Sequence, residues 1–167
     1  SPTFGGINLE DIKAPEAFEI ERRLVEELNI PVMHDDQHGT AIISGAALIN
    51  ALELANKNIK EIKMVICGAG AAAISCAKMY NSLGVRKKNI LMFDSKGLIN
   101  SKRKDLTPEK KLFSSNNIEL QSLDDATKES DVFIGLSKAD MMTKKMLLSM
   151  NKNPIVFAMA NPNPEIS

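Results

Sequence analysis

The chain has 167 residues, of which 44% are hydrophobic and 25% are charged. This length and composition are typical of a globular domain with a core of its own. Because 21 basic residues balance 21 acidic ones, no long-range charge favours nucleic acid or an anionic membrane as a partner. We expect neither a membrane span nor a signal peptide, and we expect any anionic ligand to be held by local geometry.

The cysteines indicate the redox compartment, and the two ends of the chain indicate whether it is part of a longer protein. Cys67 and Cys76 lie in apolar runs, so we expect buried free thiols in a reducing compartment rather than a disulfide. This favours the cytoplasm, or else an organellar matrix. The chain begins at Ser1 without a methionine and stops at Ser167 without a closing element. We therefore expect both ends to be cuts through a longer protein.

Hydrophobic periodicity predicts alternating helices and strands. Apolar residues recur at helical spacing over 14–28, a short apolar run covers 30–33, and an Ala/Ile/Leu-rich helix is predicted over 40–54. Further strands are predicted at 63–67, 89–94, 118–120, 131–135 and 154–160, with helices at 71–83, after Thr107, at 122–129 and at 143–150. Strands that alternate with helices pair in parallel, so we expect a doubly wound, mainly parallel α/β sheet of the Rossmann type.

A glycine-rich turn stands between the strand at 63–67 and the helix that follows. The pattern is G-x-G-x-x-A, formed by Gly68, Gly70 and Ala73, and in this context it is typical of dinucleotide binding. Gly68 permits a tight turn, and Gly70 lets the backbone approach a pyrophosphate. The helix would direct its free N–H groups at the phosphates. The alternative is a packing turn in an unrelated α/β domain.

An acidic residue at the end of the next strand completes the dinucleotide pattern. Asp94 occupies that position, where a carboxylate accepts hydrogen bonds from ribose hydroxyls. A bare carboxylate favours NAD, because it repels the 2′-phosphate of NADP. Several cations follow closely, and one of them could pair with that phosphate; they are Lys96, Lys102, Arg103, Lys104 and Lys110. The cofactor is therefore expected to be NAD or NADP, with a merely solvated basic face as the alternative for most of these cations.

Two acidic pairs come from separate segments, Glu10-Asp11 and Asp35-Asp36. Mg²⁺ and Mn²⁺ prefer such hard oxygen ligands. By spacing alone, however, acidic pairs of this kind are more often helix caps. His34 and His38 are four residues apart and could form a zinc pair, but no cysteine or third histidine is near.

Several segments together resemble malic enzyme of the bacterial type; they are residues 4–12, 30–41, 68–72, 131–135 and 157–162. The resemblance covers essentially the whole chain, and the run Asp-Asp-Gln-His-Gly-Thr at 35–40 is its most specific part. It implies that residues 1–34 are the C-terminal part of a catalytic domain that binds substrate and metal. Residues 35–167 would then be the NAD(P)-binding Rossmann domain, truncated at its C-terminal end.

The same resemblance implies oxidative decarboxylation of (S)-malate to pyruvate and CO₂, with reduction of NAD(P)⁺ and help from Mg²⁺ or Mn²⁺. It also implies a homo-oligomer, either a dimer or a tetramer. The implied metal ligands are Glu10, Asp11 and Asp36, and the implied catalytic residue is Asp35, which supports the general base electrostatically. The implied cofactor contacts are Gly68, Ala69, Gly70, Ala71, Ala72, Asp94, Ser137 and Asn161, of which Asn161 also contacts substrate.

Two other interpretations stay open at this point. The family's general-base lysine and general-acid tyrosine lie N-terminal to the residues present, so the chain alone would bind a dinucleotide without turnover. A Rossmann dehydrogenase of another kind, such as an amino-acid dehydrogenase domain, would leave the run at 35–40 unexplained. One departure from the family pattern is minor: Asn163 stands where threonine is more common.

Overall fold

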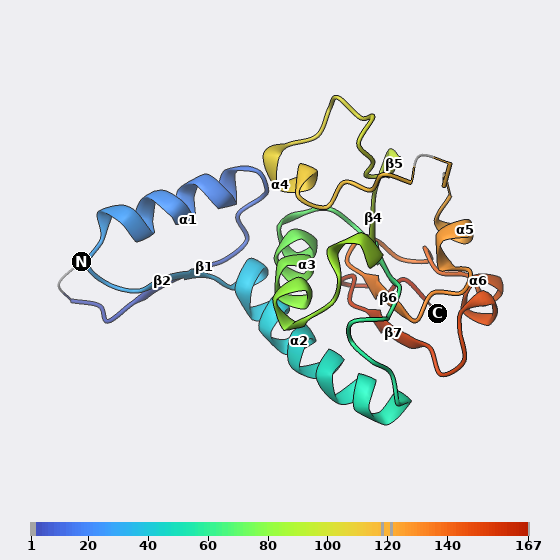
Figure 1. Ribbon diagram of the computed structural model, residues 1–167. Helices are drawn as coiled ribbons and strands as arrows, with labels where there is room; N and C mark the ends of the chain where they lie inside the picture. Colours follow the sequence, from blue (N-terminus) through green and yellow to red (C-terminus); the bar gives the residue numbers. More distant parts are fainter. Residues whose placement is uncertain (1–2, 118, 121, 167) are drawn as a thin grey trace.

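The computed structural model describes residues 3–117, 119–120 and 122–166 (Figure 1). Its elements in chain order are β1 (Ile7–Leu9), α1 (Glu16–Glu27), β2 (Val32–His34), α2 (Asp35–Ala55), β3 (Met64–Cys67), α3 (Ala71–Leu83), the 3₁₀ turn η1 (Lys87–Asn89), β4 (Ile90–Asp94), β5 (Gly97–Leu98), α4 (Pro108–Lys111), α5 (Leu123–Thr127), β6 (Val132–Gly135), α6 (Lys144–Ser149) and β7 (Ile155–Ala158).

The N-terminal segment forms a small β-α-β unit that projects from the rest of the chain (Figure 1). Strands β1 and β2 pair in parallel, with Leu9 opposite His34, and α1 connects them. The helix α2 begins directly after β2 at Asp35, earlier than the predicted start at residue 40. The acids of its first turn stabilise this earlier start, because carboxylates favour the positive end of a helix dipole. The division into residues 1–34 and 35–167 stays a prediction.

The second sheet confirms the expected α/β architecture. Its strand order is β5-β4-β3-β6-β7, and every pairing is parallel except that of the short β5 with β4. At its centre, Cys67 at the end of β3 lies opposite both Phe93 of β4 and Gly135 of β6. The chain leaves β3 toward β4 on one side and returns to β6 on the other. Ligands of such sheets bind at this switch point, beyond the carboxyl ends of the strands.

Side chains alternate between two cores, as the two-residue period of a strand requires. One core lies on the α2/α3 face and includes Met64, Ile66, Met92 and Ile134. The other lies on the α5/α6 face, where the strand residues Val65, Cys67, Leu91, Phe93 and Phe133 meet Ala126 of α5 and Met146 of α6. Helices therefore cover both faces of the sheet, and the doubly wound prediction is confirmed.

Close packing of α2 against α3 depends on small residues. A Cβ on Gly45 would lie 3.0 Å from Met79 Cγ and 3.3 Å from Leu83 Cδ1. Nearby, the Ser44 hydroxyl lies 3.5 Å from the thiol of Cys76. Both Cys67 and Cys76 are buried and free, as the sequence predicts.

Two further differences concern short elements. The two-residue strand β5 was not predicted, because two residues carry no readable periodicity. The strand predicted at 118–120 does not form at Glu119 and Leu120, and Ile118 lies outside the described residues. In the part of the chain that the structure describes, we find no helix both long and apolar enough to cross a bilayer.

Candidate dinucleotide and metal site

The turn after β3 has a conformation that only glycine tolerates at its first position. Gly68 has φ +128°, and its N–H donates to the carbonyl of Phe93 at 2.8 Å. A Cβ at this position would also overlap the backbone carbonyl of Leu136, in the loop after β6. Gly68 is therefore required both by the backbone conformation and by the close approach of a second loop.

Gly70 differs from Gly68 because no protein atom requires it to be glycine. It precedes the first turn of α3 with φ −82°, and a Cβ built there would meet nothing within 4 Å. The residue is exposed, and Ala69 and Ala72 beside it are partly exposed. The helix of 13 residues that begins at Ala71 presents its free N–H groups at this open end, where they can bind an anion.

A cavity of about 370 Å³ lies at the same edge of the sheet. Its lining includes two of the predicted cofactor residues, Asp94 and Ser137, and it is completed by Cys67, Phe93, Ser95, Gly97, Leu123, Lys138 and Met141. A larger hollow of about 730 Å³ is lined by residues near the starts of β3 and β4, including Lys63 and Ile90. We take the smaller cavity as the ligand site, because parallel sheets bind ligands at the carboxyl ends of their strands.

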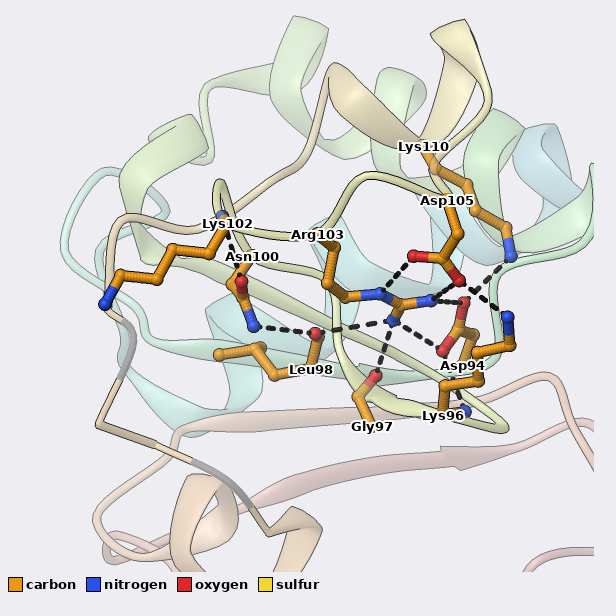
Figure 2. A network of polar contacts seen from close by, with 9 residues as sticks. All are labelled: Asp94, Lys96, Gly97, Leu98, Asn100, Lys102, Arg103, Asp105 and Lys110. Carbon is orange, nitrogen blue, oxygen red and sulfur yellow. Dashed lines mark hydrogen bonds and ion pairs between the residues drawn. The ribbon is translucent and has the colours of Figure 1, made fainter.

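Asp94 sits at the rim of this cavity in a network of cations (Figure 2). The Arg103 guanidinium donates to both of its oxygens, from Nη1 at 2.7 Å and from Nη2 at 2.9 Å. Lys110 Nζ donates to Oδ2 at 2.9 Å, and the Lys96 N–H donates to Oδ1 at 3.0 Å. Only 9% of the Asp94 side chain is exposed. Its burial raises the pKa, but the hydrogen bonds from Arg103 and Lys110 outweigh burial and hold the pKa at about 2.

This network changes the expectation for the cofactor. Arg103 also donates to Asp105, which accepts from Lys96 Nζ at 2.7 Å. The cluster therefore contains two carboxylates and three cations, and its net charge is +1. Asp94 is therefore not the bare carboxylate that the sequence predicts: Arg103 and Lys110 neutralise it, so it does not favour NAD by repelling a 2′-phosphate.

The remaining predicted cofactor residues lie in the loops after β6 and β7. Ser137 follows β6, and its N–H donates to Glu165 Oε1 at 2.9 Å. Asn161 is exposed in the loop that follows β7. The glycine turn, Asp94, Ser137 and Asn161 thus all lie at or just beyond the carboxyl ends of neighbouring parallel strands, β3, β4, β6 and β7.

The acidic pairs meet at the junction between the N-terminal unit and α2. The Asp11 N–H donates to Asp36 Oδ2 at 3.1 Å, so two of the three predicted metal ligands are adjacent. The Glu10 carboxylate instead accepts from Asn8 Nδ2 at 2.8 Å. Asp35 packs over Gly39, where a Cβ would overlap its carboxylate. Glycine at position 39 therefore gives the Asp35 carboxylate its place on the first turn of α2.

Glu21 of α1 connects α1 to β2 and α2 at this junction, and no sequence pattern distinguishes it from the other glutamates of the helix. Its carboxylate accepts from the His34 N–H at 2.9 Å and from Gln37 Nε2 at 3.2 Å, and it pairs with His38 Nε2 at 2.8 Å. The two histidines are directed to different partners, because the fully buried His34 ring has its Nε2 3.4 Å from Asp36 Oδ2. This arrangement does not support a zinc pair.

The donor set suits a hard divalent cation, although the ligands do not yet converge. No group of three His, Cys, Asp or Glu side chains among the described residues is arranged to hold a metal ion. The Asp11 backbone N–H nevertheless contacts the Asp36 carboxylate, and Glu10 adjoins Asp11 in the chain. The buried His34 ring lies near the same carboxylate, but neither of its nitrogens forms a hydrogen bond within the described part of the chain. Glu10, Asp11 and Asp36 carry carboxylate oxygens, which are the ligands that Mg²⁺ and Mn²⁺ prefer.

Comparison with known proteins agrees with this geometry. Residues 37–166 match the family described as "Malic enzyme, NAD binding domain". The chain is 52% identical over 164 residues to the NADP-dependent malic enzyme of Halomonas elongata, covering 98% of this chain and 39% of that protein. It is 52% identical over 165 residues to the NAD-dependent malic enzyme of Rhizobium meliloti, covering 99% of this chain and 21% of that protein.

A solved structure gives the same result for the fold. The crystal structure of Entamoeba histolytica malic enzyme superposes with a TM-score of 0.93 at 40% identity, covering 99% of this chain and 36% of the other. The chain thus spans less than half of the length of each of these proteins. The likeness includes the carboxylate junction as well as the dinucleotide domain, because nearly the whole chain is aligned in each case. On this evidence the chain belongs to the malic enzyme family, and most of it is that family's NAD-binding domain.

Proposed function

We propose that the protein containing this chain oxidises and decarboxylates (S)-malate to pyruvate and CO₂, with NAD⁺ or NADP⁺ as the oxidant. The observation that carries the proposal is the combination of two features in one short chain. The glycine turn and a cavity lined by Asp94 and Ser137 both lie at the carboxyl ends of the central strands, and the Asp11 N–H meets the Asp36 carboxylate at the start of α2. Proteins named as malic enzymes match the chain over both features.

The chain's own residues would divide the work as follows. Gly70 and the start of α3 receive the pyrophosphate, and Asp94 receives the adenosine ribose. Asn161 would orient the nicotinamide amide and the substrate, and the nicotinamide ring, when bound, would supply the acceptor for the hydride from C2 of malate. Glu10, Asp11 and Asp36 would hold Mg²⁺ or Mn²⁺, which when bound supplies Lewis-acid stabilisation of negative charge on the substrate oxygen. Asp35 adds a negative charge beside the general base.

The cofactor proposal leaves both nicotinamide dinucleotides in place. Relatives of similar identity are named as NADP-dependent and as NAD-dependent. The net positive charge of the Asp94 cluster supports acceptance of a 2′-phosphate, and the Asp94 carboxylate supports recognition of a ribose diol.

The test is malate-dependent formation of NAD(P)H by the intact protein. We expect turnover that EDTA abolishes and that Mn²⁺ or Mg²⁺ restores. Glu10→Gln and Asp36→Asn should each lower kcat/KM by roughly a hundredfold or more, because loss of a ligand exceeds the 10–100-fold effect of groups that only support one. Glu26→Gln is the matched control, since Glu26 only pairs with Arg22 on the exposed face of α1. Undiminished turnover in EDTA, or in the ligand variants, would exclude the proposed metal site.

A second candidate is that the chain by itself binds a dinucleotide without turnover. One observation favours it: Tyr80 is the chain's single tyrosine, and it is fully buried between α2 and α3. A general acid must lie within hydrogen-bond reach of the substrate, and the Tyr80 side chain has no exposed surface through which a substrate could reach it. Titration of the 167-residue chain with NAD⁺ and NADP⁺, combined with an activity assay, distinguishes the two candidates. Turnover by the chain alone would refute the second candidate.

The proposal also includes a homo-oligomer, either a dimer or a tetramer, and a cytoplasmic or organellar-matrix location. The oligomer rests on the family resemblance, and sedimentation of the intact protein tests it. Two buried free thiols support a reducing compartment, and fractionation of the source cells tests the location.

A further inference from the structure

One buried charge near the cavity has no role in the function proposed above. Glu165 has 0% of its surface exposed, although it lies only seven residues beyond the end of β7. No lysine, arginine or histidine in the described part of the chain forms an ion pair with it. A buried carboxylate without a cation is costly unless hydrogen bonds compensate it, so its partners indicate what it does.

Those partners are backbone N–H groups of two separate loops. Glu165 Oε1 accepts from the Ser137 N–H at 2.9 Å, in the loop after β6. Oε2 accepts from the Ala160 N–H at 3.1 Å, in the loop after β7 and next to Asn161. The Glu165 carbonyl in turn accepts from the Met142 N–H at 2.9 Å. One side chain therefore connects the two loops that carry Ser137 and Asn161.

The sheet itself is shaped to admit this carboxylate. Gly135 is the last residue of β6, and a Cβ at that position would overlap the Glu165 carboxylate. The neighbouring Leu136 lies directly against the glycine turn, because its carbonyl occupies the space that a Cβ of Gly68 would need. Gly135 pairs with Cys67 of β3, and burial, followed by the charge of Glu165, raises the pKa of the Cys67 thiol to about 11. The carboxylate thus lies at the carboxyl ends of the central strands, next to the cavity residue Ser137.

We propose that Glu165 is a positioning residue for the dinucleotide site, which fixes the loops after β6 and β7 relative to each other and to the glycine turn. The inference rests on the proposed function, because it assumes that a dinucleotide binds at this edge of the sheet. Glu165 itself has no exposed surface and contacts no ligand. It acts by holding the Ser137 and Ala160 backbones at the spacing that the cofactor requires.

The test compares two changes of a carboxylate to an amide. The Glu165 carboxylate lies against the last residue of β6, and Asp131 immediately precedes the first. Glu165→Gln replaces an acceptor with an amide NH₂, which cannot accept from one of the two N–H groups. Asp131→Asn is the matched control, because Asp131 immediately precedes β6 and accepts from the Lys63 N–H at 2.9 Å and from Lys57 Nζ at 2.7 Å. Both variants lose buried hydrogen bonds, but only the first loses them at the cofactor edge.

In the intact protein, we expect Glu165→Gln to raise the Kd for NAD⁺ or NADP⁺ by about tenfold to a hundredfold, the effect of misplacing binding groups by about 1 Å. Asp131→Asn should lower the melting temperature and leave that Kd within about twofold of wild type, because well-separated sites act independently. An unchanged Kd in Glu165→Gln would overturn the inference. An equal rise in Kd in Asp131→Asn would also overturn it, because general loss of stability would then explain both results.

Amide hydrogen exchange decides the matter even if Glu165→Gln does not fold. In wild-type protein the Ser137 and Ala160 amides should be protected, and free exchange at either one overturns the inference. In folded Glu165→Gln both should lose protection, whereas Leu136 and Met159 keep theirs, since they donate to the backbone carbonyls of Cys67 and Gly135. If the wild-type protein binds neither dinucleotide, the proposed function is wrong. The exchange pattern would still show whether Glu165 connects the two loops.

Discussion

The two glycines of the turn after β3 should respond to the same substitution in opposite ways. In Gly68→Ala the new side chain must adopt φ +128° and must also displace the carbonyl of Leu136. A residue held in a sparsely populated backbone region costs about 1–3 kcal/mol, and overpacking costs about 1–3 kcal/mol more. The free energy of unfolding should therefore fall by about 2–6 kcal/mol, which lowers the melting temperature by at least about 4 °C for a domain of this size.

Gly70→Ala should leave stability nearly unchanged and weaken dinucleotide binding. Its φ of −82° suits alanine, and the new methyl group would meet no protein atom within 4 Å. Its free energy of unfolding should stay within about 0.5 kcal/mol of wild type. The methyl group would stand where the backbone approaches the pyrophosphate, and losing one charge-assisted hydrogen bond there costs about 1.5–3 kcal/mol. The Kd for NAD(P)⁺ should therefore rise by about tenfold to a hundredfold.

Thermal melting and calorimetric titration of both variants, in the intact protein, test this pair of expectations. The reasoning is refuted if Gly68→Ala melts at the wild-type temperature, because the conformation and the contact with Leu136 would then not be those described. It is refuted equally if Gly70→Ala binds the dinucleotide as wild type does. The open space above Gly70 would then not be the path of the pyrophosphate.

Three further predictions follow from the charges of the site. The folded-state pKa of Asp94, about 2, lies below its ordinary value of 3.8. The stability that Asp94 contributes is therefore present above pH 3.8 and is lost as the pH falls toward 2. Urea unfolding should show this acid dependence in wild type and less of it in Asp94→Asn. Arg103→Ala should lower the ratio of kcat/KM for NADP⁺ to that for NAD⁺ by about tenfold, the effect of one charged hydrogen bond of about 1.4 kcal/mol, and an unchanged ratio would show that Arg103 does not meet the 2′-phosphate. Glu21→Ala should reduce the free energy of unfolding by about 1–3 kcal/mol, because the His34 N–H and the Gln37 amide lose their acceptor, and denaturant unfolding that matches wild type would contradict this.

The parts of the fold that the sequence predicts are those in which a local pattern has one physical cause. Strands β3, β4, β6 and β7 are short apolar runs because both faces of the sheet are covered by helices. The glycine turn can be predicted from the sequence because the reason for each glycine is local. Gly68 is needed for a positive φ, and Gly70 leaves space for the proposed pyrophosphate. The start of α2 was predicted too late, because an apolar pattern identifies the buried face of a helix and not its polar first turn.

The parts that escaped prediction depend on contacts between distant segments. The sequence identifies Asp94 as an acid at the end of a strand, but the neutralisation of its charge depends on Arg103 and Lys110, which lie far enough along the chain to be brought to it only by the fold. Glu21 lies on a helix with several other glutamates, and only the position of β2 distinguishes it.

Glu165 is the clearest of these cases. It follows a proline-rich segment, in a position where the sequence predicts an exposed acid. Its burial depends on the absence of a side chain at Gly135, 30 residues earlier in the chain. The apolar run that ends at Gly135 predicts a strand, and a glycine at the end of a strand does not by itself indicate a special contact. Only the two positions considered together indicate that the glycine makes room for a carboxylate. In this site the residues proposed to contact ligands belong to local motifs, whereas the residues proposed to position those motifs are defined by pairs far apart in the sequence.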